Sequence, residues 1–193
     1  MSSSFLGFYL GWAGVYAVLG TTLLLAALHA MRGPGAWRAW PLAASTLFFV
    51  ALTQHPFPDR THLSCPVPDT QILLRPFRFL GAVADRVAAG VPVWTWFGDL
   101  PAAAVAMNFV LCALIGAALS RHATRLRWAV LFGSGLSLGV ELTQLTGIWG
   151  LYPCPYRQFD VDDLILNTGG VVLGFLCVRA LDARARAPAR GAS

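Results

Sequence analysis

Long apolar runs, each followed by a short polar segment, dominate this sequence. The first run, Phe5 to Met31, has His29 as its only ionisable side chain. At about 1.5 Å per residue, a helix of this length crosses the hydrocarbon core of a bilayer with room to tilt. Four more runs follow, at Arg38 to Gln54, Pro101 to Ser120, Trp128 to Gly147 and Leu164 to Leu181. The pattern predicts an all-α, polytopic membrane bundle with about five transmembrane helices.

The long segment between the second and third runs, Gln54 to Asp99, is too polar and proline-rich to span a bilayer. Within it, RPFRFLGAVADRV places Phe77, Leu80, Ala84 and Val87 on one helical stripe, opposite Arg75, Arg78 and Arg86. This pattern predicts an amphipathic helix lying in the membrane–water interface on the outer face of the membrane. An ordinary loop helix packed over the bundle is the alternative.

Composition agrees with a membrane protein, because 56% of the residues are hydrophobic, 12% are charged and the mean hydropathy is +0.62. The first run has neither the positively charged start nor the small-residue cleavage site of a signal peptide. We expect one integral membrane domain over residues 1–181 and a disordered cytoplasmic tail over residues 182–193.

All fourteen basic residues are arginines, and they are spread through short loops instead of forming one patch. Despite the net charge of +5, this distribution does not suggest nucleic acid as a partner. Nine arginines follow the first, third and fifth runs, and five lie with most of the aspartates in the other loops. The positive-inside rule therefore predicts a multi-pass cell membrane protein with an outer N-terminus and a cytoplasmic C-terminus. The tryptophans predicted at the inner interface are Trp37, Trp40 and Trp128.

Two cysteines, Cys65 and Cys154, each precede a proline in segments predicted to lie outside the membrane. In an oxidising compartment, they can form a disulfide between the long loop and the short one. Two separate thiols are the alternative.

Polar side chains gather near the predicted outer ends of the last three runs. Glu141 and Gln144 share one face of the fourth run. Asp160 is placed to cap the fifth run, Asp163 lies in its first turn, and Asn167 lies one turn deeper. Ionisable groups within spanning segments usually mark a functional site. We therefore expect these side chains to form a polar pocket.

Two further residues complete the predicted pocket: Arg157 at its mouth and Asn108 on the third run. A GxxxG pattern in the fourth run, Gly135 and Gly139, and another in the fifth, Gly170 and Gly174, favour close contact between these two helices. A purely structural alternative has Glu141 hydrogen-bonded to Asn167 and Gln144, with the aspartates acting only as helix caps.

The motif Glu141-x-x-Gln144, then Arg157-x-Phe159-Asp160-Val161-x-Asp163 and Asn167-Thr168-x-Gly170-x-x-x-Gly174, resembles the VanZ-like family. The similarity covers about residues 72 to 178, including a helix led by Asn108 and the segment LLRPFRF. In that segment, Arg75 replaces part of the polar stretch that usually precedes Pro-Phe in the family. The resemblance implies a multi-helical membrane protein of the bacterial cell envelope. Some members of the family protect bacteria against glycopeptide or lipoglycopeptide antibiotics.

These observations favour a non-catalytic protein that binds a lipid headgroup, a cell-wall precursor or an amphiphilic peptide at the outer leaflet, with Arg157 gripping phosphate or carboxylate. The alternative is an intramembrane enzyme in which Glu141 or Asp163 acts as a general acid or base on a lipid-linked substrate. A transporter is less favoured because no internal duplication is evident. No metal site is assigned, since the carboxylates have no established ligand spacing, and no cofactor is expected.

Overall fold

The structure is a computed structural model of the chain, and it describes residues 3–55, 57, 59, 63, 65, 72–98 and 100–186. Helices dominate this part of the chain, which confirms the all-α class. In chain order, the elements are α1 (Ser3–Arg32), η1 (Pro34–Ala39), α2 (Trp40–Gln54), β1 (Ile72–Leu73), α3 (Arg78–Ala88), η3 (Val93–Gly98), α4 (Leu100–Leu119), α5 (Leu126–Leu145), α6 (Gly147–Gly150), β2 (Phe159–Asp160) and α7 (Val161–Arg186).

Each of the five predicted spanning runs is a helix, within a few residues of its predicted bounds. In the described part of the chain, three helices contain stretches long and apolar enough to cross a membrane: Leu10–Arg32, Ala102–Leu119 and Val161–Arg186. Helix α2 has 15 residues and so extends about 22 Å, which is less than the roughly 30 Å hydrocarbon core. Helix α5 carries several polar side chains. A total of five crossings therefore stays a prediction.

Helices α4 and α7 pack backbone to backbone through glycines. A Cβ added at Gly174 would lie 1.8 Å from the Ala113 carbonyl oxygen, and one added at Gly170 would lie 2.6 Å from the Phe109 carbonyl oxygen. Only glycine permits such an approach. The α7 glycines therefore bring this helix against α4, whereas the sequence had suggested α5 as their partner.

Helices α5 and α7 do meet, but through a glycine outside the predicted pair. A Cβ added at Gly133 would lie 3.2 Å from the Thr168 Cα of α7. Among the described residues, no atom of a neighbouring element lies within 4 Å of the Cβ position at Gly135 or Gly139. The predicted role of the α5 GxxxG pattern in this contact is therefore wrong, because both of its glycines face open space.

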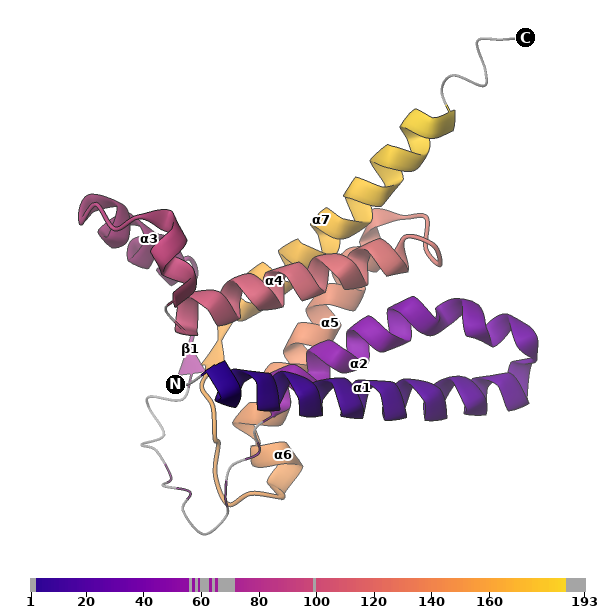
Figure 1. Cartoon of the computed structure of the whole chain (residues 1–193), viewed down its shortest axis with the longest axis horizontal. Coiled ribbons are helices and arrows are strands. Elements are labelled where there is room, and N and C mark those ends of the chain that lie inside the picture. The colour runs from indigo at the N-terminus through magenta and orange to yellow at the C-terminus, as the bar shows by residue number, and fades with distance from the viewer. Residues whose placement is uncertain are drawn as a thin grey trace.

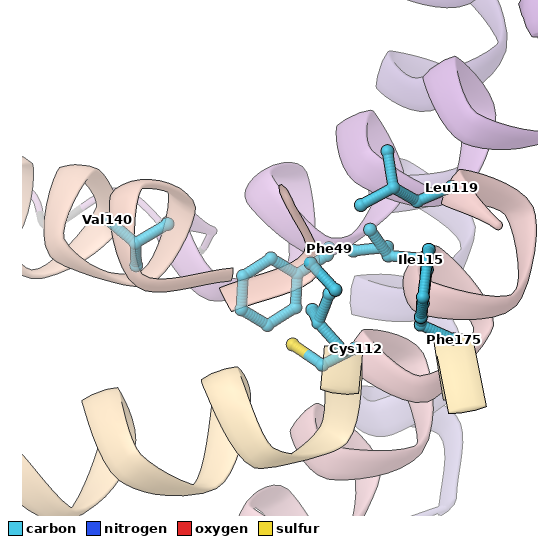
Figure 2. Close-up of a cluster of buried hydrophobic side chains, with 8 residues drawn as sticks. Phe49, Cys112, Ile115, Leu119, Val140 and Phe175 are labelled. Atoms are coloured by element: carbon cyan, nitrogen blue, oxygen red, sulfur yellow. The ribbon is translucent and has the colours of Figure 1, made fainter. Parts of the chain in front are cut away.

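The apolar core joins α2, α4, α5 and α7. Figure 2 shows Phe49 of α2 between Val140 of α5 and the α4 side chains of Cys112 and Ile115. Phe175 of α7 closes the cluster. Phe49 and Ile115 are fully buried. Because four helices supply this cluster, it fixes their relative positions.

Helix α3 projects away from the helical bundle (Figure 1), and none of its residues is buried. Its apolar side chains Leu80, Val83 and Val87 are exposed. The alternative in which this helix packs over the bundle is therefore wrong. Its place in the membrane interface stays a prediction, which the exposed apolar stripe supports.

The C-terminal helix continues past the predicted start of the tail. Helix α7 runs to Arg186, whereas the sequence suggested disorder from residue 182. Residues 182–186 add one helical turn because they contain alanine and arginine, which are both strong helix formers. The rest of the predicted tail, residues 187–193, lies outside the described residues.

Candidate functional site

The candidate site lies where α5 ends and α7 begins. Figure 1 shows that β1, α6 and the first turns of α4 and α7 gather at one end of the bundle. Between α5 and α7, the chain turns back at Gly147, whose φ is +60°. A Cβ there would lie 2.8 Å from the Cys154 carbonyl oxygen, so the turn requires glycine. This reversal brings residues 157–163 against the end of α5.

Glu141 is 2% exposed, and its Oε2 accepts the backbone N–H of Asp160 at 3.0 Å. A buried carboxylate is costly unless hydrogen bonds compensate for lost hydration. Here the compensation includes a main-chain donor beside the positive N-terminal end of α7. Glu141 therefore anchors the entry of α7 to α5. This bond differs from the predicted pairing of Glu141 with Asn167 and Gln144.

Asp160 and Asp162 continue the network outward. Asp160 Oδ1 accepts the backbone N–H of Asp162 at 3.0 Å, which is the predicted capping role, and its Oδ2 lies 3.4 Å from Arg78 Nη1. Asp162 is 5% exposed and accepts the backbone N–H groups of Phe77 at 2.5 Å and Phe79 at 3.1 Å. The start of α7 therefore holds the start of α3.

The two-stranded sheet reinforces this junction. Strand β1 pairs with β2 in parallel, with Ile72 opposite Phe159 and Leu73 opposite Asp160. The pairing brings the segment before α3 beside the segment before α7. The exposed helix α3 is thus tied to the bundle at its N-terminal end.

Asp163 and Asn167 lie deeper along α7. Asp163 and Glu141 lie within electrostatic range of each other, and both carboxyl groups lie within electrostatic range of Arg157. Asn167 Nδ2 donates to Ser137 Oγ at 3.0 Å, and that hydroxyl donates to the Asp163 carbonyl oxygen at 3.3 Å. These bonds link α5 and α7 along one buried face.

Gln144 and Arg157 bind the end of α2 instead of α7. Gln144 Nε2 donates to the Thr53 carbonyl oxygen at 2.8 Å, and Arg157 Nη1 donates to the same oxygen at 3.1 Å. The last carbonyl groups of a helix have no intrahelical partners, so these donors cap α2. Arg157 is otherwise exposed, as expected for a group at the mouth of a site.

Gln54 links the end of α2 to α5 and to the loop before α7. Its Nε2 donates to the Val140 carbonyl oxygen at 3.4 Å, and its Oε1 accepts the hydroxyl of Tyr156. Burial raises the pKa of Tyr156 to about 12, so the phenol keeps its proton at neutral pH. We call the bonded set Thr53, Gln54, Gln144, Tyr156 and Arg157 the α2 cap network.

Asn108 is half-buried on α4, and within the described residues no hydrogen bond joins it to this cluster. The structure thus brings the other six predicted residues to the same end of the bundle, but in three bonded groups. Sequence reasoning missed Gln54, Ser137, Tyr156 and Asp162 as members. An amide at the end of an apolar run was the available signal for Gln54, and the second acid of FDVDD was the signal for Asp162.

Two apolar cavities adjoin the α2 cap network. One of about 330 Å³ and another of about 310 Å³ share Val50, Gln54 and Thr143 in their linings. The first is also lined by Gly135, Leu136, Gly139, Val140 and Trp149, and the second by Tyr16, Ala51, Phe57 and Ile148. We call the combined space the α2–α5 groove. Gln54 is therefore shared by a polar network and an apolar groove.

Cys65 and Cys154 form a disulfide, with their Cα atoms 5.7 Å apart. The bridge links segments separated by 89 residues and lies beside the turn at Gly147. In the described part of the chain, no group of three or more His, Cys, Asp or Glu side chains has the geometry to hold a metal ion.

Helices that can cross a bilayer, with a buried polar cluster at one end, define this chain as a helical membrane protein. The family model described as VanZ/LLP1 matches residues 42–182. The chain therefore belongs to the VanZ/LLP1 family. This match begins within α2, so it includes the helix that carries Thr53 and Gln54 as well as the motif recognised from the sequence. No curated protein and no solved structure matches the chain.

Proposed function

We propose that this protein binds an amphiphilic molecule at the extracytoplasmic membrane surface and thereby contributes to glycopeptide or lipoglycopeptide resistance. The ligand class comprises a lipid, a lipid-linked cell-wall precursor or an amphiphilic peptide. The observation that carries the proposal is the position of Gln54. This residue bonds to Tyr156 in the α2 cap network and also lines the α2–α5 groove.

The polar half of the ligand would meet Arg157. This guanidinium is exposed and uses one bond to the Thr53 carbonyl oxygen. A guanidinium has five N–H donors in a planar fork, so donors are left for phosphate or carboxylate. The buried Glu141 and the half-buried Asp163 lie within electrostatic range of Arg157 and contribute to the local field.

The apolar half of the ligand would occupy the α2–α5 groove. Its described lining is mostly apolar, with polar groups on Gln54, Thr143, Tyr16 and Trp149. Gly139 leaves space in it, because among the described residues no atom of a neighbouring element lies within 4 Å of an added Cβ. A hydrocarbon chain gains about 0.8 kcal/mol for each CH₂ group that it buries. The groove therefore suits an acyl chain whose headgroup remains near Arg157.

A binding measurement on the protein in nanodiscs tests the proposal, with teicoplanin as the acylated probe and a glycopeptide without an acyl chain as its comparison. We expect the acylated probe to bind more tightly. Arg157→Ala and Gly139→Leu should each weaken binding of the acylated probe at least tenfold. The first removes the guanidinium that binds phosphate or carboxylate, and the second fills the groove. Arg127→Ala, which removes an arginine from the other end of the bundle, is the charge control.

Equal affinities of the wild type, Arg157→Ala and Gly139→Leu for the acylated probe would overturn the proposal. A resistance assay in cells addresses the enzymatic alternative through Glu141→Gln, which keeps the shape and an acceptor for hydrogen bonds but removes the titrating group. Resistance retained by this variant in cells argues against proton chemistry at Glu141. Loss of resistance with intact folding and binding would favour the enzyme instead.

A further inference from the structure

A second cavity lies at the opposite end of the bundle, away from the candidate site. It has a volume of about 830 Å³ and lies between the α1–α2 connection and the turn that follows α4. Figure 1 shows these two connections at the same end of the bundle. We call this space the basic cavity. The side chains that matter here are Arg32, Arg38, Arg121, His122, Trp37 and Trp40.

The charged side chains that line the basic cavity are arginines. Arg32 and Arg38 come from the first connection and Arg121 comes from the second, and no aspartate or glutamate is among the described residues of the lining. Among the described residues, the recorded ion pair joins Arg78 to Asp160, at the other end of the molecule. Cations that converge without acids repel one another, and a bound anion removes that repulsion. The cavity is therefore suited to an anionic group.

Local backbone geometry maintains this convergence. Helix α1 ends at Arg32, and Gly33 then adopts a φ of +80°, which only glycine adopts readily. Pro34 begins the 3-10 turn η1, which carries Trp37 and Arg38 back toward α2. The tight connection thus holds Arg32 and Arg38 on the same side of the hairpin.

Aromatic and apolar surfaces surround the charges. Trp37 is 47% exposed and Trp40 is 58% exposed, although both are large amphipathic side chains. Tryptophan indoles prefer the headgroup region of a bilayer. An adjoining cavity of about 510 Å³ shares His122 with the basic cavity and is lined by apolar residues of α4 and α5 that include Leu131 and Phe132. A basic cavity therefore opens beside an apolar one.

We propose that the basic cavity binds the phosphate headgroup of an anionic phospholipid, with an acyl chain running past Leu131 and Phe132. Arginine suits this ligand because its planar fork pairs with phosphate oxygens. The arginine distribution predicts this end to be cytoplasmic, where anionic lipids attract basic groups near helix ends. The site is separate from the α2–α5 groove, so either proposal can fail without the other.

Lipid binding to the purified, delipidated protein tests this proposal, with native mass spectrometry as the readout. The probes are phosphatidylglycerol, phosphatidylcholine of the same acyl chains, and inorganic phosphate. We expect phosphatidylglycerol to bind at least tenfold more tightly than phosphatidylcholine. Arg38→Gln with Arg121→Gln should abolish that preference. Arg184→Gln with Arg186→Gln, which removes two arginines from the end of α7 outside the cavity, should retain it.

Equal binding of the two phospholipids would overturn the proposal, as would an undiminished preference in the Arg38→Gln, Arg121→Gln variant. Binding of inorganic phosphate as tight as that of phosphatidylglycerol would identify a free-phosphate site and would also overturn the lipid assignment. Circular dichroism of each variant establishes that its helices are intact. If the glutamine variant does not fold, Arg38→Lys with Arg121→Lys is the replacement, because it keeps the charge. Loss of the phosphatidylglycerol preference in this lysine variant supports a bidentate arginine–phosphate contact. Full retention of the preference contradicts that contact.

Discussion

The side chain of Glu141 in α5 accepts the backbone N–H of Asp160, the residue directly before α7, at 3.0 Å. Glu141 is 2% exposed, so the acceptor of this bond is buried. The bond explains why an acidic residue is kept in an apolar helix: it satisfies a main-chain donor at the start of the next long helix. The same carboxyl group lies within reach of Asp163 and in the field of Arg157, which links packing to the proposed site.

Replacing Glu141 should separate its hydrogen-bonding role from its charge. Glu141→Ala leaves the Asp160 N–H without its acceptor and should lower the free energy of unfolding by about 1–3 kcal/mol. Glu141→Gln keeps an acceptor for that N–H, so its stability should stay close to the wild type. Unfolding in mixed detergent micelles measures both. An equal loss in the two variants would show that the charge itself is required.

Replacing Gly174 should separate α4 from α7. A Cβ at this position meets the Ala113 carbonyl oxygen at 1.8 Å, and that backbone atom cannot move without moving α4. We expect Gly174→Ala to lower the free energy of unfolding by about 1–3 kcal/mol or more, as overpacking does. Gly135→Ala is the matched control, because nothing lies within 4 Å of its added Cβ. Similar stabilities for the two variants would contradict the packing.

Removing the Asp162 side chain should release the start of α3. Asp162 accepts the N–H groups of Phe77 and Phe79, and a hydrogen bond to a charged group contributes about 1.5–3 kcal/mol. Amide hydrogen exchange at these two residues should therefore become at least about tenfold faster in Asp162→Ala. Asp85→Ala, on the exposed surface of α3, should leave it unchanged. Unaltered exchange in Asp162→Ala would mean that α3 is held by other contacts.

The disulfide offers a test of membrane orientation. In intact cells, a membrane-impermeant maleimide should label Cys65 and Cys154 only after treatment with a reductant, because the positive-inside rule places both outside. A Cys112→Ser, Cys177→Ser background removes the two free cysteines. Reduction should also lower thermal stability, since native disulfides contribute about 2–5 kcal/mol. Labelling without reductant would disprove the bridge, and labelling only in broken cells would reverse the orientation.

The helices could be predicted closely from the sequence because an apolar run in lipid satisfies its backbone polar groups most simply as a helix. The gathering of Glu141, Asp160, Asp163 and Asn167 followed from helix spacing. The hydrogen-bonding partner of each of these side chains did not follow from that spacing. The acceptor role of Glu141 toward Asp160 depends on a chain reversal in which Ile148 and Trp149 both adopt left-handed conformations, at φ of 54° and 55°. No periodicity in the sequence encodes that path.

Long-range contacts were the other limit of sequence reasoning. Gln54 and Tyr156 are 102 residues apart, and nothing in either local sequence indicates that the two side chains meet. Glycine patterns show that a helix can be approached closely, but they do not name the partner. Gly170 and Gly174 therefore pointed to a real close contact and to the wrong helix. The α2 cap network and the α2–α5 groove became evident only from the packing of α2 against α5 in the structure.

The central claim is that the α2–α5 groove holds an amphiphile whose polar end lies at Arg157. An electron cryo-microscopy structure of the protein in nanodiscs with bound teicoplanin measures this most directly. The account predicts density for an acyl chain beside Gly139 and Trp149, continuous with polar density next to Gln54 and Arg157. A groove closed by its own side chains, with the antibiotic bound elsewhere on the protein, would contradict it.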